Sequence, residues 1–201
     1  LELSPGRTAT LDARRRVQWA GREVILGGRY DLFGGFLNGD LFALSNRWLL
    51  SADTRFTPQT RTVLADRFTV SNFGPDGSNP PQTSRDGVYN DLSLTQYLYT
   101  SELTRYLFVR QEYNAAWTRG ANYARDGATT RIGAHSPLLW QTDADMSTSF
   151  AYHRYPRFTS LSALDTARRR DTTWDLAAAL THYLSPQLAL RLQYQWVNAL
   201  N

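Results

Sequence analysis

The residues best suited to catalysis or metal binding in this sequence are three histidines and a few nearby serines. His135, His153 and His182 lie far apart in the chain and lack the spacing of a metal site. Ser147 and Ser149 precede His153 closely enough to suggest a serine hydrolase, but no nucleophile-elbow motif and no acidic partner accompany them. We therefore interpret these side chains as polar groups of a larger sheet and expect a protein that is not an enzyme.

Other motifs that bind ions or cofactors are also weak. The segment 75–86 has too few acidic residues for a calcium loop. The glycine pairs at 27–28 and 34–35 follow no phosphate-loop pattern, and bends or close approach within a strand explain them better. The sequence contains no cysteine, which removes disulfides and thiolate ligands. We expect no metal ion and no cofactor.

The strongest pattern in the sequence is the alternation of apolar and polar residues, which is typical of strands with one apolar face. Near the C-terminus, Ala189, Arg191 and Gln193 alternate with large apolar side chains, namely Leu188, Leu190, Leu192, Tyr194 and Trp196. A compact turn at 184–187 joins this strand to the preceding one, which predicts a hairpin. The same unit recurs upstream as far as Leu11, so we predict roughly ten strands of about 10 to 14 residues, long enough to cross a membrane with a tilt.

The predicted turns alternate in size along most of the chain. Short turns are expected at 57–60, 101–104, 141–144 and 184–187, and longer polar loops at 74–87, 119–127 and 157–171, whereas the short link 37–40 departs from this rule. Short turns at one end and long loops at the other are typical of outer-membrane barrels. Because a sheet in hydrocarbon must pair all its backbone groups, we predict an all-β, antiparallel, up-and-down transmembrane β-barrel.

The composition is compatible with a protein that crosses a membrane by strands. No stretch approaches the roughly 18 to 20 apolar residues of a membrane helix. The mean hydropathy is −0.46, which suits barrel strands because only alternate residues face lipid. All 22 basic residues are arginine and the net charge is +4. These arginines are scattered and accompany no nucleic-acid-binding motif, so we expect no nucleic acid as a partner.

One predicted face of the sheet carries residues suited to contact with lipid. The chain has six tryptophans, eleven tyrosines and nine phenylalanines, and aromatic residues gather where hydrocarbon meets the lipid headgroups. Several tryptophans lie near predicted strand ends. The candidates for lipid contact or for an aromatic girdle are Trp19, Trp48, Trp117, Trp174, Leu188, Leu190, Leu192, Tyr194 and Trp196.

The opposite face is rich in arginine and carboxylates. The candidates for lining a lumen are Arg14, Arg16, Arg29, Asp31, Arg47, Asp53, Arg55, Arg110, Glu112, Arg131, Asp175 and Arg191. Two interpretations stay open: the charges pair with one another and stiffen the lumen, or the arginines bias passage toward anionic solutes such as acidic sugars. The absence of lysine fits either GC-rich coding or a use of the planar guanidinium group.

A set of short motifs characterises residues 85–201. They are Arg85-Asp86-Gly87 followed by a strand, Tyr152-His153-Arg154-Tyr155, Ser160, Arg169-Arg170-Asp171, and the run from His182 to Tyr194. This part of the chain resembles the closing hairpins of Gram-negative outer-membrane β-barrels. A similar group is the barrels that follow periplasmic tetratricopeptide-repeat regions, which include surface-lipoprotein assembly modifiers and exopolysaccharide-export porins. The resemblance implies a location in the bacterial outer membrane and a role in export or passage.

The chain departs from these barrels at its end. They commonly finish with a strand that ends in an aromatic residue, whereas this sequence ends at Ala199-Leu200-Asn201. We therefore expect residues 1–201 to be one barrel domain that is a fragment of a longer chain.

The function expected from the sequence is that of a conduit for export or passage of a polymer, a lipoprotein or an anionic solute. One alternative is a structural or anchoring barrel, whose lumen is plugged by its own arginine–carboxylate pairs and whose loops bind a partner. A second alternative is a soluble β-sandwich or lipocalin-like binding protein, in which the tryptophans would be buried core residues. The expected partners are outer-membrane lipid and a periplasmic or cell-surface protein or polysaccharide.

Overall fold

The computed structural model describes residues 3–37, 40–73, 85–120, 122–156 and 169–200, and these residues form β-strands with no helix among them. The strands are β1 (Leu3–Trp19), β2 (Arg22–Leu37), β3 (Asp40–Thr57), β4 (Thr60–Phe73), β5 (Gly87–Tyr99), β6 (Tyr106–Thr118), β7 (Arg125–Pro137), β8 (Thr142–Tyr155), β9 (Arg169–Ser185) and β10 (Leu188–Leu200). Their number and type confirm the all-β class predicted from the alternation of apolar and polar residues.

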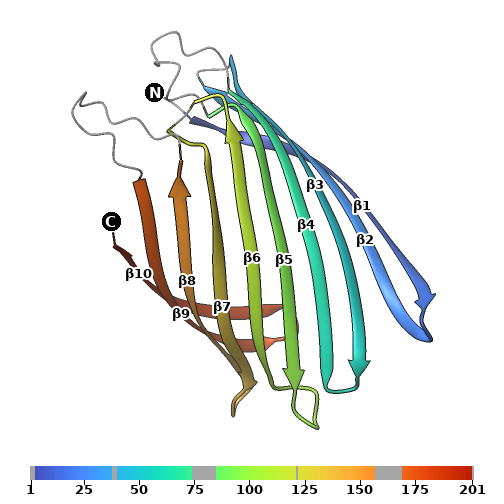
Figure 1. The fold of residues 1–201 in the computed structure, drawn as a ribbon. Helices are drawn as coiled ribbons and strands as arrows, with labels where there is room; N and C mark the ends of the chain where they lie inside the picture. Colours follow the sequence, from blue (N-terminus) through green and yellow to red (C-terminus); the bar gives the residue numbers. More distant parts are fainter. Residues whose placement is uncertain (1–2, 38–39, 74–84, 121, 157–168, 201) are drawn as a thin grey trace.

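The strands form one meandering sheet in which each strand pairs antiparallel with its neighbours in sequence, in the order β1 to β10. This arrangement confirms the up-and-down topology. In the part of the chain described here no ladder joins β1 to β10, and the closed barrel expected from the sequence stays a prediction. Figure 1 shows that the sheet is long, twisted and strongly curved.

The curvature of the sheet gives its two faces different exposure. In β6, Phe108, Arg110 and Glu112 are half-buried, whereas the alternating Leu107 and Val109 are exposed. Side chains on the inner side of a curved sheet converge, while those on the outer side spread apart. The face with the charged residues is therefore the inner one. We call it the concave face and its opposite the convex face.

The β1–β2, β3–β4, β5–β6, β7–β8 and β9–β10 turns all lie at the same end of the sheet, since consecutive strands run antiparallel (Figure 1). The short connections are residues 20–21, 58–59, 100–105, 138–141 and 186–187. Ala20 and Gly21 both adopt positive φ, 51° and 74°, as the tightest hairpin turns with right-handed twist require. The predicted loops 74–87 and 157–171 and the link 37–40 fall largely or partly outside the described residues.

One predicted turn is wrong in position. The β7–β8 turn lies at residues 138–141 and not at 141–144, because Trp140 and Gln141 adopt positive φ and Thr142 already begins β8. The apolar run Leu138-Leu139-Trp140 resembles strand sequence, yet these three side chains are exposed in the turn.

Candidate functional site

The pairing register assigns each strand residue to a face, because directly paired residues of neighbouring strands point to the same side. One line of partners on the concave face runs Arg16, Ile25, Asp53, Val63, Thr95, Arg110, Arg131, Ser149, Asp175 and Val197. The neighbouring line on the convex face runs Val17, Val24, Thr54, Thr62, Gln96, Val109, Ile132, Thr148, Leu176 and Trp196.

The register keeps the two predicted sets of residues apart. All twelve candidates for lining a lumen lie on the concave face. The candidates for lipid contact lie on the convex face. The β9–β10 pairing is irregular at Leu188, and we assign this residue to the convex face because it alternates with Leu190. Contact with lipid and lining of a lumen stay predictions for these two sets.

The convex face exposes large apolar side chains along every strand. Leu192 is 72% exposed, Leu107 58% and Trp117 60%. Tryptophans lie toward both ends of this face, with Trp19 beside a tight turn and Trp117, Trp174 and Trp196 toward the long connections. Trp48 departs from a girdle position, because it lies in the middle of β3, between the rings of Tyr30 and Phe68.

Polar side chains on the convex face donate hydrogen bonds to one another. The donor–acceptor pairs are Tyr30–Asn46 (2.6 Å), Thr62–Gln96 (2.6 Å), Asn90–Asp66 (2.5 Å), Thr130–Gln111 (2.8 Å) and Trp174–Thr148 (2.8 Å). Such pairing reduces the free-energy cost of placing polar groups in an apolar medium. Arg15 is a charged residue on this face, where it pairs with Leu26 of β2. It lies four residues from Trp19, so its long side chain can extend toward the end of the strand.

The polar residues that the sheet buries all lie on the concave face. They are Asp31, Ser71, Ser93, Thr95, Ser149 and Asp175. Asp31 accepts hydrogen bonds from Arg29 Nε at 2.8 Å and from Thr10 Oγ1 at 2.7 Å. The charge of Asp175 was expected from the sequence to balance that of an arginine. Its carboxylate instead accepts a hydrogen bond from the side-chain amide of Gln195, with Nε2 at 2.6 Å. The register explains this, because Gln195 on β10 pairs with the residue two positions beyond Asp175.

A connected network crosses β4, β5 and β6 on the concave face. Arg67 Nε donates to Asp91 Oδ2 at 2.9 Å, and Asn114 Nδ2 donates to Asp91 Oδ1 at 2.7 Å. Asn114 Nδ2 also donates to Glu112 Oε1 at 2.7 Å, and Arg110 forms an ion pair with Glu112. The side chains are partly shielded, with Asp91 22% and Glu112 17% exposed. Five residues from three strands are thereby held in fixed positions.

An aromatic and charged cluster occupies the concave face toward the tight turns. Tyr106 stacks on His135 with 5.0 Å between ring centroids and lies 5.5 Å from the ring of Tyr97. His135 Nδ1 lies 2.9 Å from Asp145 Oδ1, and Arg191 Nη1 lies 3.8 Å from Asp145 Oδ2. His135 is thus a polar member of a cluster in which Asp145 contacts both its ring and Arg191. In the described part of the chain no group of three potential ligands could hold a metal ion.

Four arginines on the concave face lack a carboxylate within 4.0 Å in the described structure: Arg47, Arg55, Arg125 and Arg131. Arg55 lies over the ring of Tyr99 at 5.7 Å. Arg131 is the direct cross-strand partner of Arg110, and like charges directly opposite each other are destabilising. An anion that entered between these two side chains would relieve the repulsion.

The described concave face carries twelve arginines against ten carboxylates. Sequence reasoning missed several of them, including Arg61, whose guanidinium binds Asp53 with distances of 2.6 to 3.1 Å. It also missed Arg67 and Asp91 as site residues. Their positions in the alternation would have found them, because each shares its side of the strand with other polar residues.

The central network should contribute measurably to stability. Asp91→Ala leaves Arg67 and Asn114 without their shared acceptor, so we expect the free energy of unfolding to fall by about 1–3 kcal/mol. Asp12→Ala is the matched control, because its contact with Arg14 is 3.5 Å long and both side chains are well exposed, and it should cost about 0.5 kcal/mol or less. Urea unfolding in lipid vesicles would measure both. If both variants lowered the free energy of unfolding equally, the network would contribute no more to stability than an exposed ion pair.

Comparisons of this chain with protein families, with curated proteins and with solved structures give no match. Within the described residues no helix is long and apolar enough to cross a membrane.

Proposed function

We propose that this sheet forms the wall of a transmembrane β-barrel in a bacterial outer membrane, with lipid against the convex face and an aqueous passage along the concave face. The proposal depends on one observation: large apolar side chains are exposed on the convex face, while every buried polar residue in the described structure lies on the concave face. In a water-soluble protein the apolar face would be the buried one.

A soluble sandwich or lipocalin-like protein fits this exposure poorly. Monomeric soluble proteins rarely expose a contiguous apolar patch larger than a few hundred Å², and a sandwich requires a second layer against its apolar face. The described strands form one sheet, and most of its large exposed apolar residues lie on the outside of the curve, where a ligand-binding barrel would be polar. Contact with the hydrocarbon tails of lipids would explain the exposure of apolar side chains over the whole convex face.

The strands are long enough for this role. The shortest, such as β5, contain 13 residues. At about 3.3 Å per residue such a strand is about 43 Å long, and a tilt of about 40° reduces its height to about 33 Å, which exceeds the apolar band of about 25 Å in outer-membrane barrels.

The arginine surplus supports a passage for anions. Arg47, Arg55 and Arg131 have no carboxylate within ion-pair distance among the described residues, and Arg110 and Arg131 lie opposite each other. Arginine binds carboxylates and phosphates through its planar fork. The substrate class we propose is therefore an anionic solute or polymer, such as an acidic polysaccharide. The resemblance to barrels linked to tetratricopeptide repeats adds a secreted polymer or lipoprotein to the candidates.

A second candidate is a structural or anchoring barrel with a filled lumen. The hydrogen-bonded network of Arg67, Asp91, Asn114, Glu112 and Arg110 favours it, because such a network fixes charged side chains across three strands and can narrow a passage. Its loops would then bind a partner protein.

Two measurements test the proposal. The purified protein should stay monodisperse only in detergent and should insert into planar bilayers as steps of conductance with a preference for chloride over potassium. Monodisperse behaviour without detergent would contradict contact with lipid. Insertion with no current at any voltage would contradict the passage and favour the filled barrel.

A further inference from the structure

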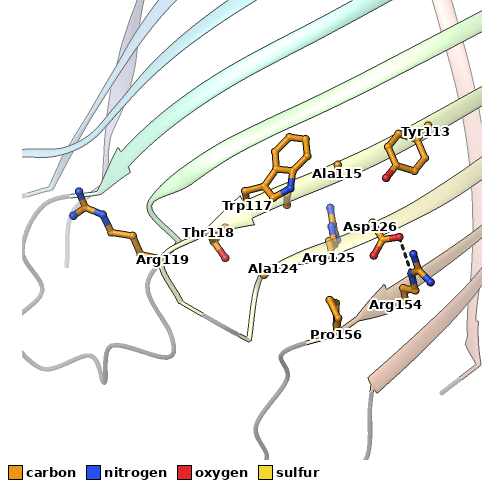
Figure 2. Close-up of a pocket in the computed structure, with 11 residues that line it drawn as sticks. Tyr113, Ala115, Trp117, Thr118, Arg119, Ala124, Arg125, Asp126, Arg154 and Pro156 are labelled. Carbon is orange, nitrogen blue, oxygen red and sulfur yellow. Dashed lines mark hydrogen bonds and ion pairs between the residues drawn. The ribbon is translucent and has the colours of Figure 1, made fainter.

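Two adjoining depressions lie at the end of β6, β7 and β8. Their volumes are about 480 and 350 Å³, and they share Asp126, Arg154 and Pro156. Figure 2 shows the residues that line the larger of the two. Most of the lining strand residues, among them Tyr113 and Trp117, belong to the convex face. The hollow therefore lies on the outside of the curved sheet, not on the side of the proposed passage.

Small residues create this hollow between larger ones. Ala115, which lies on the convex face, is 4% exposed and Ala124 is 8% exposed, so their two methyl groups form the floor of the hollow. Tyr113 and Trp117 rise on one side as exposed aromatic walls (Figure 2). A flat strand surface thereby becomes a recess large enough for a polar headgroup.

The convex-face lining of the two depressions is basic. It carries Arg154 and Arg170 against the single carboxylate of Asp126, whereas Arg125 belongs to the concave face and Arg119 forms an ion pair with Asp86. Arg154 Nε donates a hydrogen bond to Asp126 Oδ2 at 2.7 Å, so the charge of this carboxylate is balanced by Arg154.

Arg170 is the direct cross-strand partner of Arg154, and in the described structure no carboxylate lies within 4.0 Å of it. Two guanidinium groups directly opposite each other repel, and a dianionic phosphate between them would replace this repulsion with charge-assisted hydrogen bonds.

The surroundings of the hollow suit an amphiphile. Toward the tight turns, the convex face continues with Val109, Ile132 and Phe150, all exposed and apolar. Tyr113 and Tyr152 lie between these residues and the arginines, as aromatic residues do at the boundary of hydrocarbon and headgroups. A charged headgroup in the hollow would leave its acyl chains against this apolar surface.

We propose that this hollow binds the phosphate headgroup of an anionic membrane lipid, with Arg154 and Arg170 as its principal ligands. The inference rests on the proposed membrane position of the convex face, and it adds a lipid site outside the passage. Basic pockets at the membrane surface recognise phosphorylated headgroups through the same chemistry.

The test uses the full chain in a neutral detergent, with its tryptophan fluorescence quenched by lipids that carry bromine on their acyl chains. We expect brominated phosphatidic acid to quench at much lower concentration than brominated phosphatidylcholine. Trp117→Phe should remove most of that difference. Because each lost guanidinium removes charge-assisted hydrogen bonds, Arg154→Gln with Arg170→Gln should weaken the affinity for phosphatidic acid by about tenfold or more.

Two controls keep the test specific. Arg15→Gln removes another arginine of the convex face, remote on β1, and should leave the affinity unchanged. Arg170→Gln alone spares the Arg154–Asp126 ion pair and should still weaken binding severalfold if the double variant fails to fold.

Three outcomes would overturn the inference. The first is equal quenching by both brominated lipids in a protein that needs detergent, and the second is an Arg154/Arg170 variant with unchanged affinity for phosphatidic acid. The third is full competition by millimolar inorganic phosphate, which would identify free phosphate as the ligand. The first two leave the proposed conduit intact, so failure of the lipid site and failure of the proposed function are distinguishable.

Discussion

Replacing Leu192 by arginine should lower the free energy of unfolding in lipid vesicles by about 2–4 kcal/mol, the cost of an arginine in the hydrocarbon of an outer-membrane barrel. The same change at Gln193 should alter it by about 0.5 kcal/mol or less, as for most exposed positions in water. Both residues are exposed neighbours on β10 and differ in face, since Leu192 pairs with Leu180 and Gln193 with Ala179.

Comparing these two variants tests whether water or lipid covers each face of the sheet. If water covered both faces, two exposed positions on one strand would tolerate arginine equally. Leu94→Arg in β5 repeats the test away from the edge of the sheet, because Leu94 is 49% exposed on the same face as Leu192. Guanidinium unfolding monitored by tryptophan fluorescence measures all three variants. Similar stabilities for Leu192→Arg and Gln193→Arg would refute the lipid-facing assignment.

Changing Arg47 and Arg131 together to glutamate should convert an anion-preferring passage into one that prefers cations. Neither arginine has a carboxylate within 4.0 Å in the described structure, although Arg47 lies opposite Asp31 in the β2–β3 register. Each substitution therefore changes a charge that no close ion pair holds. The described concave face carries a surplus of two arginines over its carboxylates, and the double variant reverses that balance. We expect the permeability ratio of chloride to potassium to fall about tenfold, a modest effect for charges that line a confined aqueous space.

The reversal potential in a salt gradient across a planar bilayer measures this ratio. Arg15→Gln is the control, because Arg15 lies on the convex face and its loss should leave the reversal potential unchanged. A double variant that conducts with unaltered selectivity would place Arg47 and Arg131 outside the passage.

The sequence by itself determined the strands and the composition of their faces. Side chains of a strand point to alternate sides whatever its neighbours are, so the alternation of Leu188 to Trp196 with polar residues already separated two faces. The same reasoning placed Arg110 and Glu112 together, because residues two apart in a strand are neighbours on one face. These predictions needed only the period of the pattern.

Only the tertiary structure decided which residues meet across strands. Asp53 binds Arg61 and Asp91 binds Arg67 because the register of each hairpin sets the partners, and one added residue in a turn would change every pair. The β7–β8 turn at 138–141 shows how an exposed apolar run can mislead a sequence pattern. The basic hollow around Arg154 and Arg170 also required the fold, because its parts come from β6, β7, β8 and β9 and from alanines that only packing makes a floor.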